Sequence, residues 1–527
     1  MTTTFDSSTS VPSFRRLGVG LVLFLLVFQI WARYVPHPTA VFVVDDWTNW
    51  SRSQFYSSAS EAFKAGLQDA KRPISMAAVE SVFHLAGNRM AFWTGLSIMA
   101  NTALLFFVLM MVWRLTDSAI AVLGGGVLLS VLPNLTETFH WSTQVLNEVS
   151  CALVFYAASG WLWIEFVRRG GMVWLIGSVV AFGIGLFSYE AGALLPASYL
   201  LLLPWKKPVR DVLIMSAFGG VLLFYAAWRL TNSFGMNELW VYPVHMDAGL
   251  SLTTIWWNAR QLVHWWVGDH FWGTALSGWS SFSTLQGGVR RSLFVLNAGL
   301  ATMVLWWAKH LLREKTSGAS PHFSPAKILG FGLVWLTAAA MIPLISYTAS
   351  RLMVLPAIGV ALLFGFLLST VPFVQMRAFW FFPLLGFLCA TQGISESYRQ
   401  AGELNQRLHQ HLTETLADWS EKELILIDSV SVRHRLTPGL LRPTGRHPET
   451  WSTFNRALLI RGISLRGMIH QITGTFTPPQ TIILDVEHHA SWEGEDMVWT
   501  DRFDSETANR TPSATVYRVD LGDLLWP

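Results

Sequence analysis

Two adjacent carboxylates, Asp45 and Asp46, follow the first apolar run of the chain in the string AVFVVDDWTNW. A carboxylate at a membrane surface is partly desolvated, and beside a second negative charge at least one of the two has a raised proton affinity. Such a group can act as a general base that takes a proton from a hydroxyl acceptor, or it can hold a divalent cation. No other cofactor is indicated. The alternative interpretation is a solvated helix end or loop start.

Two further acids lie close to apolar runs. Glu190, in GLFSYEAGALLPASYLLLL, is flanked by apolar residues on both sides, and an acid at such a depth is costly and tends to face a cavity. Its alternative role is a simple turn acid between two short spans. Glu137, with His140 and Glu148, belongs to PNLTETFHWSTQVLNEVS. These three side chains line the same cavity on one interpretation and serve helix packing or a turn on the other.

Arginines supply the opposite charge. Arg351, in SYTASRLMVLPAIGVALLFG, stands in an otherwise uncharged outer loop, which calls for a partner. The guanidinium fork suits the oxygens of a lipid-carrier phosphate, although an interfacial arginine can also touch bulk lipid headgroups. Arg72, in KRPIS, is a second candidate for the same phosphate, and Lys71 and Arg72 can equally be a solvated pair.

The composition indicates that these residues sit in a membrane protein. Charged residues make up only 13% of the 527 positions, about half the share usual in soluble domains. The 27 tryptophans suit membrane interfaces. A net charge of +3, without a basic run carrying interleaved aromatics, gives no indication of a nucleic-acid partner. The two cysteines, Cys151 and Cys389, lie in apolar stretches, which argues against a disulfide framework or a thiolate metal site.

Apolar runs long enough to span a membrane predict a polytopic α-helical protein with about eleven transmembrane helices. The runs are 17–35, 91–113, 118–132, 144–167, 172–188, 191–204, 211–230, 293–309, 327–347, 352–370 and 377–394. Lys and Arg concentrate in alternate short loops, which places the N-terminus in the cytoplasm and the C-terminus outside. The third and sixth runs are short enough to be tilted or re-entrant.

This topology divides the chain into two parts. Residues 1–395 form the transmembrane module, with large outer segments at 36–90 and 231–292. Residues 396–527 hold 18 acidic and 13 basic residues and no apolar run of membrane length. Helices are predicted near 397–419 and 450–460 and strands at 423–428, 481–487 and 514–520, so this part is predicted to be an extracytoplasmic α/β domain.

The order of these motifs resembles the GT-C glycosyltransferases. The resemblance is closest to the transmembrane protein O-mannosyltransferases that carry TPR repeats, and to their bacterial relatives. It covers roughly 38–365 and rests on Asp45-Asp46, Lys71-Arg72-Pro73, SYEAGALLPASYLLL and the string RLMVLPAIG that begins at Arg351. The TPR array is absent, and histidines usual near the second span are missing, with Asn101 near one such place.

The resemblance implies a GT-C fold and an inverting transfer of sugar from a polyprenyl-phosphate donor to a glycan, lipid or protein hydroxyl on the outer face. Asp45 would be the general base with Asp46 beside it, Arg351 and Arg72 would contact the donor phosphate, and Glu190 and Glu137 would be cavity acids. A bacterial inner membrane and contact with its lipids are expected. A glycan or lipid transporter or flippase, a glycan polymerase or ligase, and a non-catalytic assembly protein remain alternatives.

Overall fold

The computed structural model describes most of the chain up to residue 416 and short stretches beyond it. The described ranges are 11–36, 42, 45–69, 72–233, 252–314, 322–345, 350–370, 377–416, 424–428, 468, 472, 482–484, 489–493, 496–501, 504–512 and 516–520. Inside them, the side chains of Asp45, Glu137 and Arg351 lie outside the description. The structure places these three residues through their backbone elements alone.

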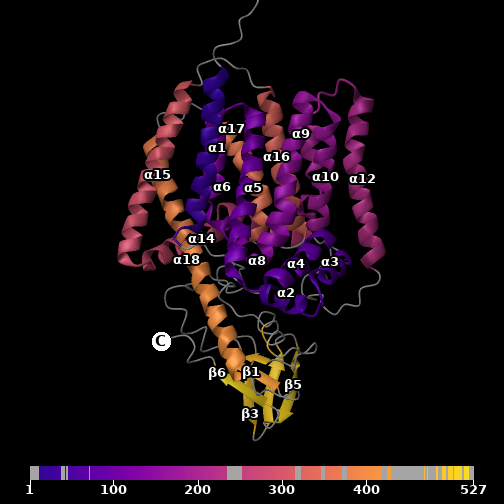
Figure 1. Cartoon of the computed structure of the whole chain (residues 1–527), viewed down its shortest axis with the longest axis vertical. Coiled ribbons are helices and arrows are strands. Elements are labelled where there is room, and N and C mark those ends of the chain that lie inside the picture. Colours follow the sequence, from indigo (N-terminus) through magenta and orange to yellow (C-terminus); the bar gives the residue numbers. More distant parts are fainter. Residues whose placement is uncertain are drawn as a thin grey trace, which may run out of the picture.

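Long apolar helices build a bundle (Figure 1). Among the described residues, five helices are long and apolar enough to cross a membrane, namely Met90–Thr116, Ser142–Arg169, Pro208–Asn232, Gly287–Leu311 and Pro325–Ile345. Shorter apolar helices accompany them, including Gly18–Tyr34, Ala119–Val131, Met172–Ser188 and Val354–Thr370. The protein is therefore a polytopic helical membrane protein, as predicted. The total of eleven spans stays a prediction.

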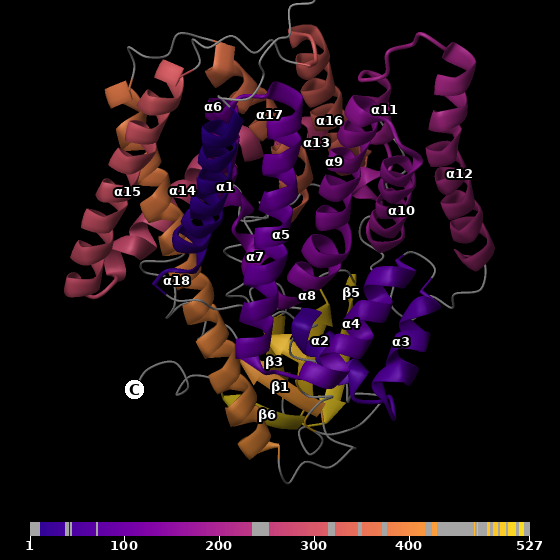
Figure 2. The same cartoon turned by 45° about the horizontal axis from the view of Figure 1, so that its top comes forward.

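The bundle helices have the following bounds: α1 Val11–Tyr34, α5 Met90–Thr116, α6 Ala119–Val131, α8 Ser142–Gln144, the π-helix η2 Val145–Leu153, α9 Val154–Arg169, α10 Met172–Ser188, α12 Pro208–Ser233, α15 Gly287–Glu314, α16 Pro325–Ile345, α17 Val354–Thr370 and α18 Arg377–Thr415. α15 and α12 stand at opposite edges of the bundle in two views (Figures 1 and 2). Small residues let the central helices approach closely, because a Cβ added at Gly125 of α6 would stand 2.9 Å from the carbonyl oxygen of Ala361 in α17.

Short elements gather at one end of the bundle, which we call the α2–α4 end. They are α2 Asp45–Ser53, α3 Ala59–Leu67, α4 Pro73–Ala86, η1 Pro133–Leu135, α7 Glu137–His140, η3 Glu190–Gly192 and η4 Ser350–Met353. In its described residues, the outer segment 36–90 thus contains the helices α2, α3 and α4. An aromatic cluster of Phe42, Trp47, Trp50, Phe83 and Trp93 joins α2 and α4.

The second outer segment forms α13 Leu252–Trp266 and α14 Asp269–Thr284. α14 packs along α18 so closely that a Cβ on Gly393 would overlap the backbone of Gly278. α13 buries Trp265 but leaves Trp256 and Trp257 exposed, as expected for an amphipathic helix.

Two expected helices differ from the structure. The sixth apolar run, 191–204, contains only η3 and the five-residue α11 Pro196–Leu200, which rises about 7 Å and cannot cross a bilayer. The helix predicted near 397–419 is no separate element, because α18 runs without a break from Arg377 to Thr415. Its last turns bury Leu408 and Leu412 against the aromatic cluster, so apolar contacts extend the helix beyond the bundle.

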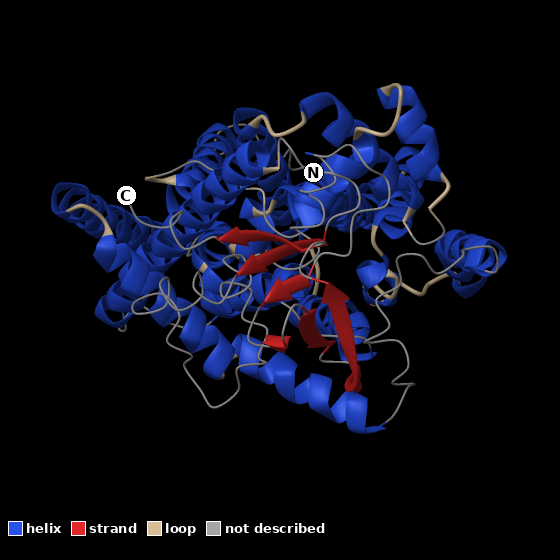
Figure 3. Ribbon diagram, turned by 90° about the horizontal axis from the view of Figure 1, so that it is seen from below, coloured by secondary structure: helices blue, strands red, loops and turns tan. Residues whose placement is uncertain are grey.

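The C-terminal part contains two small sheets at the α2–α4 end (Figures 1 and 3). Strands β1 Leu424–Asp428, β2 Ile482–Leu484 and β6 Val516–Asp520 pair in parallel in the order β2-β1-β6. β3 His489–Glu493, β4 Asp496–Asp501 and β5 Asp504–Pro512 form an antiparallel sheet. Strands β1, β2 and β6 fall inside the predicted β-runs. The helix predicted at 450–460 lies outside the described residues, and the α/β domain as a whole stays a prediction.

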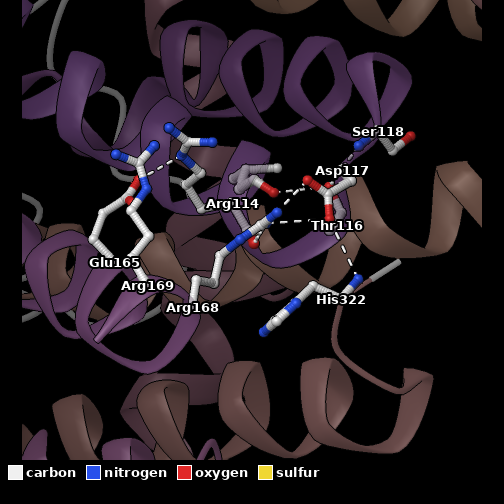
Figure 4. Close-up of polar contacts among 9 residues, drawn as sticks. Arg114, Thr116, Asp117, Ser118, Glu165, Arg168, Arg169 and His322 are labelled. Atoms are coloured by element: carbon white, nitrogen blue, oxygen red, sulfur yellow. Dashed lines mark hydrogen bonds and ion pairs between the residues drawn. The ribbon is translucent and has the colours of Figure 1, made fainter. Parts of the chain in front are cut away.

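Charged side chains at the C-terminal ends of α5 and α9 form a network of ion pairs and hydrogen bonds (Figure 4). Glu165, only 1% exposed, lies 2.5 Å from Arg114 Nε and 2.7 Å from Arg169 Nε. Arg168 Nη1 donates to Asp117 Oδ1 at 2.9 Å, and the backbone N–H of His322 donates to Asp117 Oδ2 at 3.3 Å. These contacts tie together the ends of α5 and α9 and the segment before α16.

Candidate functional site

Asp46 anchors the start of α2. Its side chain is fully buried, and its Oδ1 accepts hydrogen bonds from the backbone N–H of Thr143, at 2.6 Å, and from the Thr143 hydroxyl. Asn49 Nδ2 donates to the same hydroxyl at 3.0 Å. Because Asp46 is buried, the interpretation of the acidic pair as a solvated helix end does not hold for this residue. Asp46 fixes α2 against α8, and this fixes the backbone that carries Asp45.

Asp45 is the first residue of α2, and its side chain lies outside the described residues. A carboxylate in the first helical turn is favoured by the positive end of the helix dipole. Segment 133–144, which includes Thr143, also contains η1 and α7. Both of these short helices pack against η4, the element that carries Arg351. Segment 133–144 therefore contacts both α2, which begins with the acidic pair, and the backbone of Arg351.

Glu137 is the first residue of α7 in this same segment, and its side chain lies outside the described residues. His140 and Glu148, which the sequence grouped with it, are both buried. Glu148 belongs to η2, a nine-residue π-helix. π-helical turns are rare and frequent at functional sites. Gln144 Oε1 and Asn147 Oδ1 are buried and have no hydrogen-bond partner among the described residues. The junction of α8 and η2 therefore contains two unsatisfied polar atoms.

Arg72 and Glu190 bind each other. Arg72 Nε lies 3.1 Å from Glu190 Oε2, and Arg72 Nη2 lies 3.2 Å from Glu190 Oε1, so the guanidinium grips the carboxylate with two parallel hydrogen bonds. The Tyr189 ring stacks on the guanidinium, 4.0 Å from its central carbon. The pair joins the N-terminal end of α4 to η3, and the Ser75 hydroxyl donates to Ser188 O beside it.

Arg72 also sets the charge state of its partner. Burial acts to raise the pKa of Glu190, but the charge and hydrogen bonds of Arg72 outweigh it, so the pKa lies below its usual range. Glu190 is thus held ionised at neutral pH. Both side chains keep about a quarter of their surface exposed, so Glu190 is more than a turn acid between two helices.

One acid in this region was missed from the sequence. Glu80 on α4 is 3% exposed and forms an ion pair with Arg52, while its Oε2 has no hydrogen-bond partner. Burial raises the pKa of Glu80, and Arg52 offsets only part of that effect. A single acid inside the apolar string PISMAAVESVFHLA was the available signal. Within the described residues, no three His, Cys, Asp or Glu side chains form a group that could hold a metal ion.

The structure therefore forms two polar groups at the α2–α4 end. Asp45-Asp46 and the Arg351 backbone both adjoin the 133–144 segment, and Arg72 with Glu190 joins α4 to η3. The helix α4 contacts α2 and begins directly after Arg72, so it connects the two groups. This geometry holds the ionised Glu190 beside the start of α4 and fixes the Arg72 guanidinium in one orientation.

Comparisons with known proteins return structures at low similarity. No protein-family model and no curated protein sequence matches the chain. The crystal structure of ArnT from Cupriavidus metallidurans bound to undecaprenyl phosphate has a TM-score of 0.34 and 12% identity, covering 80% of this chain and 83% of that one. The apo form of the same enzyme has a TM-score of 0.32, 13% identity and the same coverage. At these values the likeness establishes neither the detailed fold nor the activity.

Proposed function

We propose that the protein is a GT-C-type membrane glycosyltransferase that moves a sugar from a polyprenyl-phosphate donor to a hydroxyl acceptor. The observation that carries the proposal is the anchoring of the acidic pair. Asp46 is buried and tied to Thr143, in a segment that also packs against the η4 element of Arg351. The motifs that resemble GT-C enzymes begin with Asp45-Asp46 and end with the string that starts at Arg351.

In the proposed reaction Asp45 is the general base. It takes the proton from the acceptor hydroxyl as the acceptor oxygen bonds to the anomeric carbon. The bond from that carbon to the phosphate oxygen breaks, and the polyprenyl phosphate leaves with the electron pair. Attack opposite to the leaving group inverts the anomeric centre. Arg351 stabilises the negative charge of the departing phosphate.

Asp46 has a positioning role in this proposal, because both of its identified donors come from Thr143. Arg72 is the second phosphate contact, with its guanidinium oriented by Glu190 and Tyr189. Glu137, the first residue of α7, is proposed to be a cavity acid. The N-terminus is proposed to be cytoplasmic and the α2–α4 end to face outward in a bacterial inner membrane. α1 runs from the opposite end of the bundle to the α2–α4 end (Figure 1), which is compatible with that orientation.

The test is sugar transfer by the full-length protein in vesicles supplied with a panel of radiolabelled polyprenyl-phosphate sugars. Two products are measured, released polyprenyl phosphate and the new glycoside. Replacing Asp45 by Asn should lower the rate by about 10²–10⁴-fold, the usual contribution of a general base. Glu414→Gln, which changes an exposed carboxylate on α18, is the matched control and should leave the rate unchanged.

Equal rates for wild type and Asp45→Asn would remove Asp45 as the base. Movement of the labelled lipid across the bilayer without any new glycosidic bond would instead support the transporter alternative. Chain growth by whole glycan blocks would support the polymerase or ligase.

A further inference from the structure

Arg33 is a buried cation that the proposed reaction does not use. It stands in the last turn of α1 and is 2% exposed. Its Nη2 donates a hydrogen bond to the carbonyl oxygen of Leu129 in α6, and its central carbon lies 3.9 Å from the centre of the Phe139 ring. Nε and Nη1 have no hydrogen-bond partner, and no carboxylate pairs with Arg33 within the described part of the chain.

Among the described side chains, which do not include that of Glu137, Arg33 has no counter-ion. The guanidinium stays protonated in proteins, and a buried charge is strongly unfavourable unless it is paired and its donors are satisfied. The C-terminal carbonyls of α6 and the face of Phe139 compensate part of the charge. Two guanidinium nitrogens, Nε and Nη1, remain without an acceptor among the described residues, and an anion can accept from both of them.

The surroundings hold Arg33 in place and add donors. The Ser395 hydroxyl donates to Arg33 O at 2.5 Å, and the neighbouring Tyr34 hydroxyl lies 2.6 Å from Ser97 Oγ. Thr136 and Thr138, in the same segment as Phe139, are fully buried, and neither hydroxyl has a partner. Thr138 directly precedes Phe139, whose ring contacts the guanidinium, so an unpaired hydroxyl neighbours in the chain a residue that touches Arg33.

We propose that Arg33 binds a phosphate group, with the hydroxyls of Thr136 and Thr138 completing its coordination. A phosphate offers several oxygens and can accept from both free nitrogens of the guanidinium. The group can belong to a lipid headgroup or to free phosphate, which share this chemistry. The proposed contacts do not include Arg351 or Arg72, and the proposal stands whether or not the protein transfers sugar.

The test measures binding of three probes to the full-length protein, purified in phosphate-free detergent solution. The probes are geranyl phosphate, geraniol and inorganic phosphate. Wild type should bind geranyl phosphate, inorganic phosphate or both, and geraniol more weakly. Replacing Arg33 by Gln should raise the Kd for the phosphate probe by about tenfold or more. Arg291→Gln, at an exposed arginine of α15, is the matched control and should bind as wild type.

The probes distinguish the source of the phosphate. Arg33-dependent binding of geranyl phosphate alone assigns a lipid phosphate, and equal dependence for inorganic phosphate assigns the free ion. Should Arg33→Gln fail to fold, Arg33→Lys and Thr138→Val must each weaken binding several-fold. Unchanged Kd values in these variants would overturn the proposal. So would phosphate binding that Arg351→Gln abolishes and Arg33→Gln leaves intact, an outcome that keeps the proposed function.

Discussion

Breaking the pair between Arg72 and Glu190 should loosen the join between α4 and η3. The two hydrogen bonds, at 3.1 and 3.2 Å, are charge-assisted, and the side chains are 27% and 25% exposed. Exposed ion pairs contribute about 0.2–1 kcal/mol, and hydrogen bonds to charged groups about 1.5–3 kcal/mol. Partial exposure puts the coupling between these ranges, at about 1–2 kcal/mol, or roughly 5- to 30-fold in a local opening equilibrium.

Hydrogen exchange measured by mass spectrometry on the first turns of α4 reports that opening directly. Wild type, Arg72→Met, Glu190→Gln and the double variant form a double-mutant cycle, in which effects of each substitution alone cancel. Each single variant should speed exchange, and the double variant should add little more. Arg399→Met, which removes the arginine from its pairs with Glu396 and Glu403 on α18, should leave α4 unchanged.

The coupling should also depend on pH with a definite sign. Because Arg72 holds the pKa of Glu190 below its ordinary value of 4.5, the ionised pair stabilises the fold fully above that value. The stabilisation is lost as the pH falls through the lower pKa of the folded protein. A coupling below about 0.3 kcal/mol at pH 7 would refute the reasoning, since additive sites agree within that margin. A coupling that grows on acidification would refute it as well.

Two further predictions concern the bundle. Replacing Glu165 by Gln should destabilise the protein by about 1–3 kcal/mol, because Arg114 and Arg169, which are 25% and 51% exposed, would lose a charged hydrogen-bond partner. A thermal melt checks this prediction, and an unchanged melting temperature contradicts it. For topology, a membrane-impermeant maleimide added to intact cells should label Glu61→Cys in α3 and not Lys206→Cys beyond α11, both exposed positions. The native Cys151 and Cys389 are half-buried and buried, so their background should be low. The reverse labelling would invert the proposed orientation.

The sequence predicted the helical membrane class because the apolar runs are local and long. It located the candidate acids for the same reason, since a carboxylate beside an apolar run stands out without knowledge of its partners. The partners themselves were out of reach. Asp46 binds Thr143, which is 97 residues away, and Arg72 binds Glu190 at a separation of 118. Spacing along the chain carries no information about contacts at that range.

Arg33 shows a different limit. It lies inside the run predicted as the first span, 17–35, and a charge there is itself a functional signal. In the sequence, Arg33 gave no sign of a site, because an arginine close to the end of a span can extend its charged group into the membrane interface. Its 2% exposure and its two unpaired nitrogens show that Arg33 is a buried cation and does not reach the interface.

The two aspartates also divide in a way that residue type does not indicate. Both residues are aspartates, yet one carboxylate oxygen of Asp46 accepts hydrogen bonds from the backbone N–H and the hydroxyl of Thr143. These hydrogen bonds fix the position of Asp46, which is its role in the proposed function. Asp45 therefore stays the proposed base of the pair. Thr143→Val should therefore slow the proposed transfer by misplacing α2, while Asp45→Asn removes the base itself.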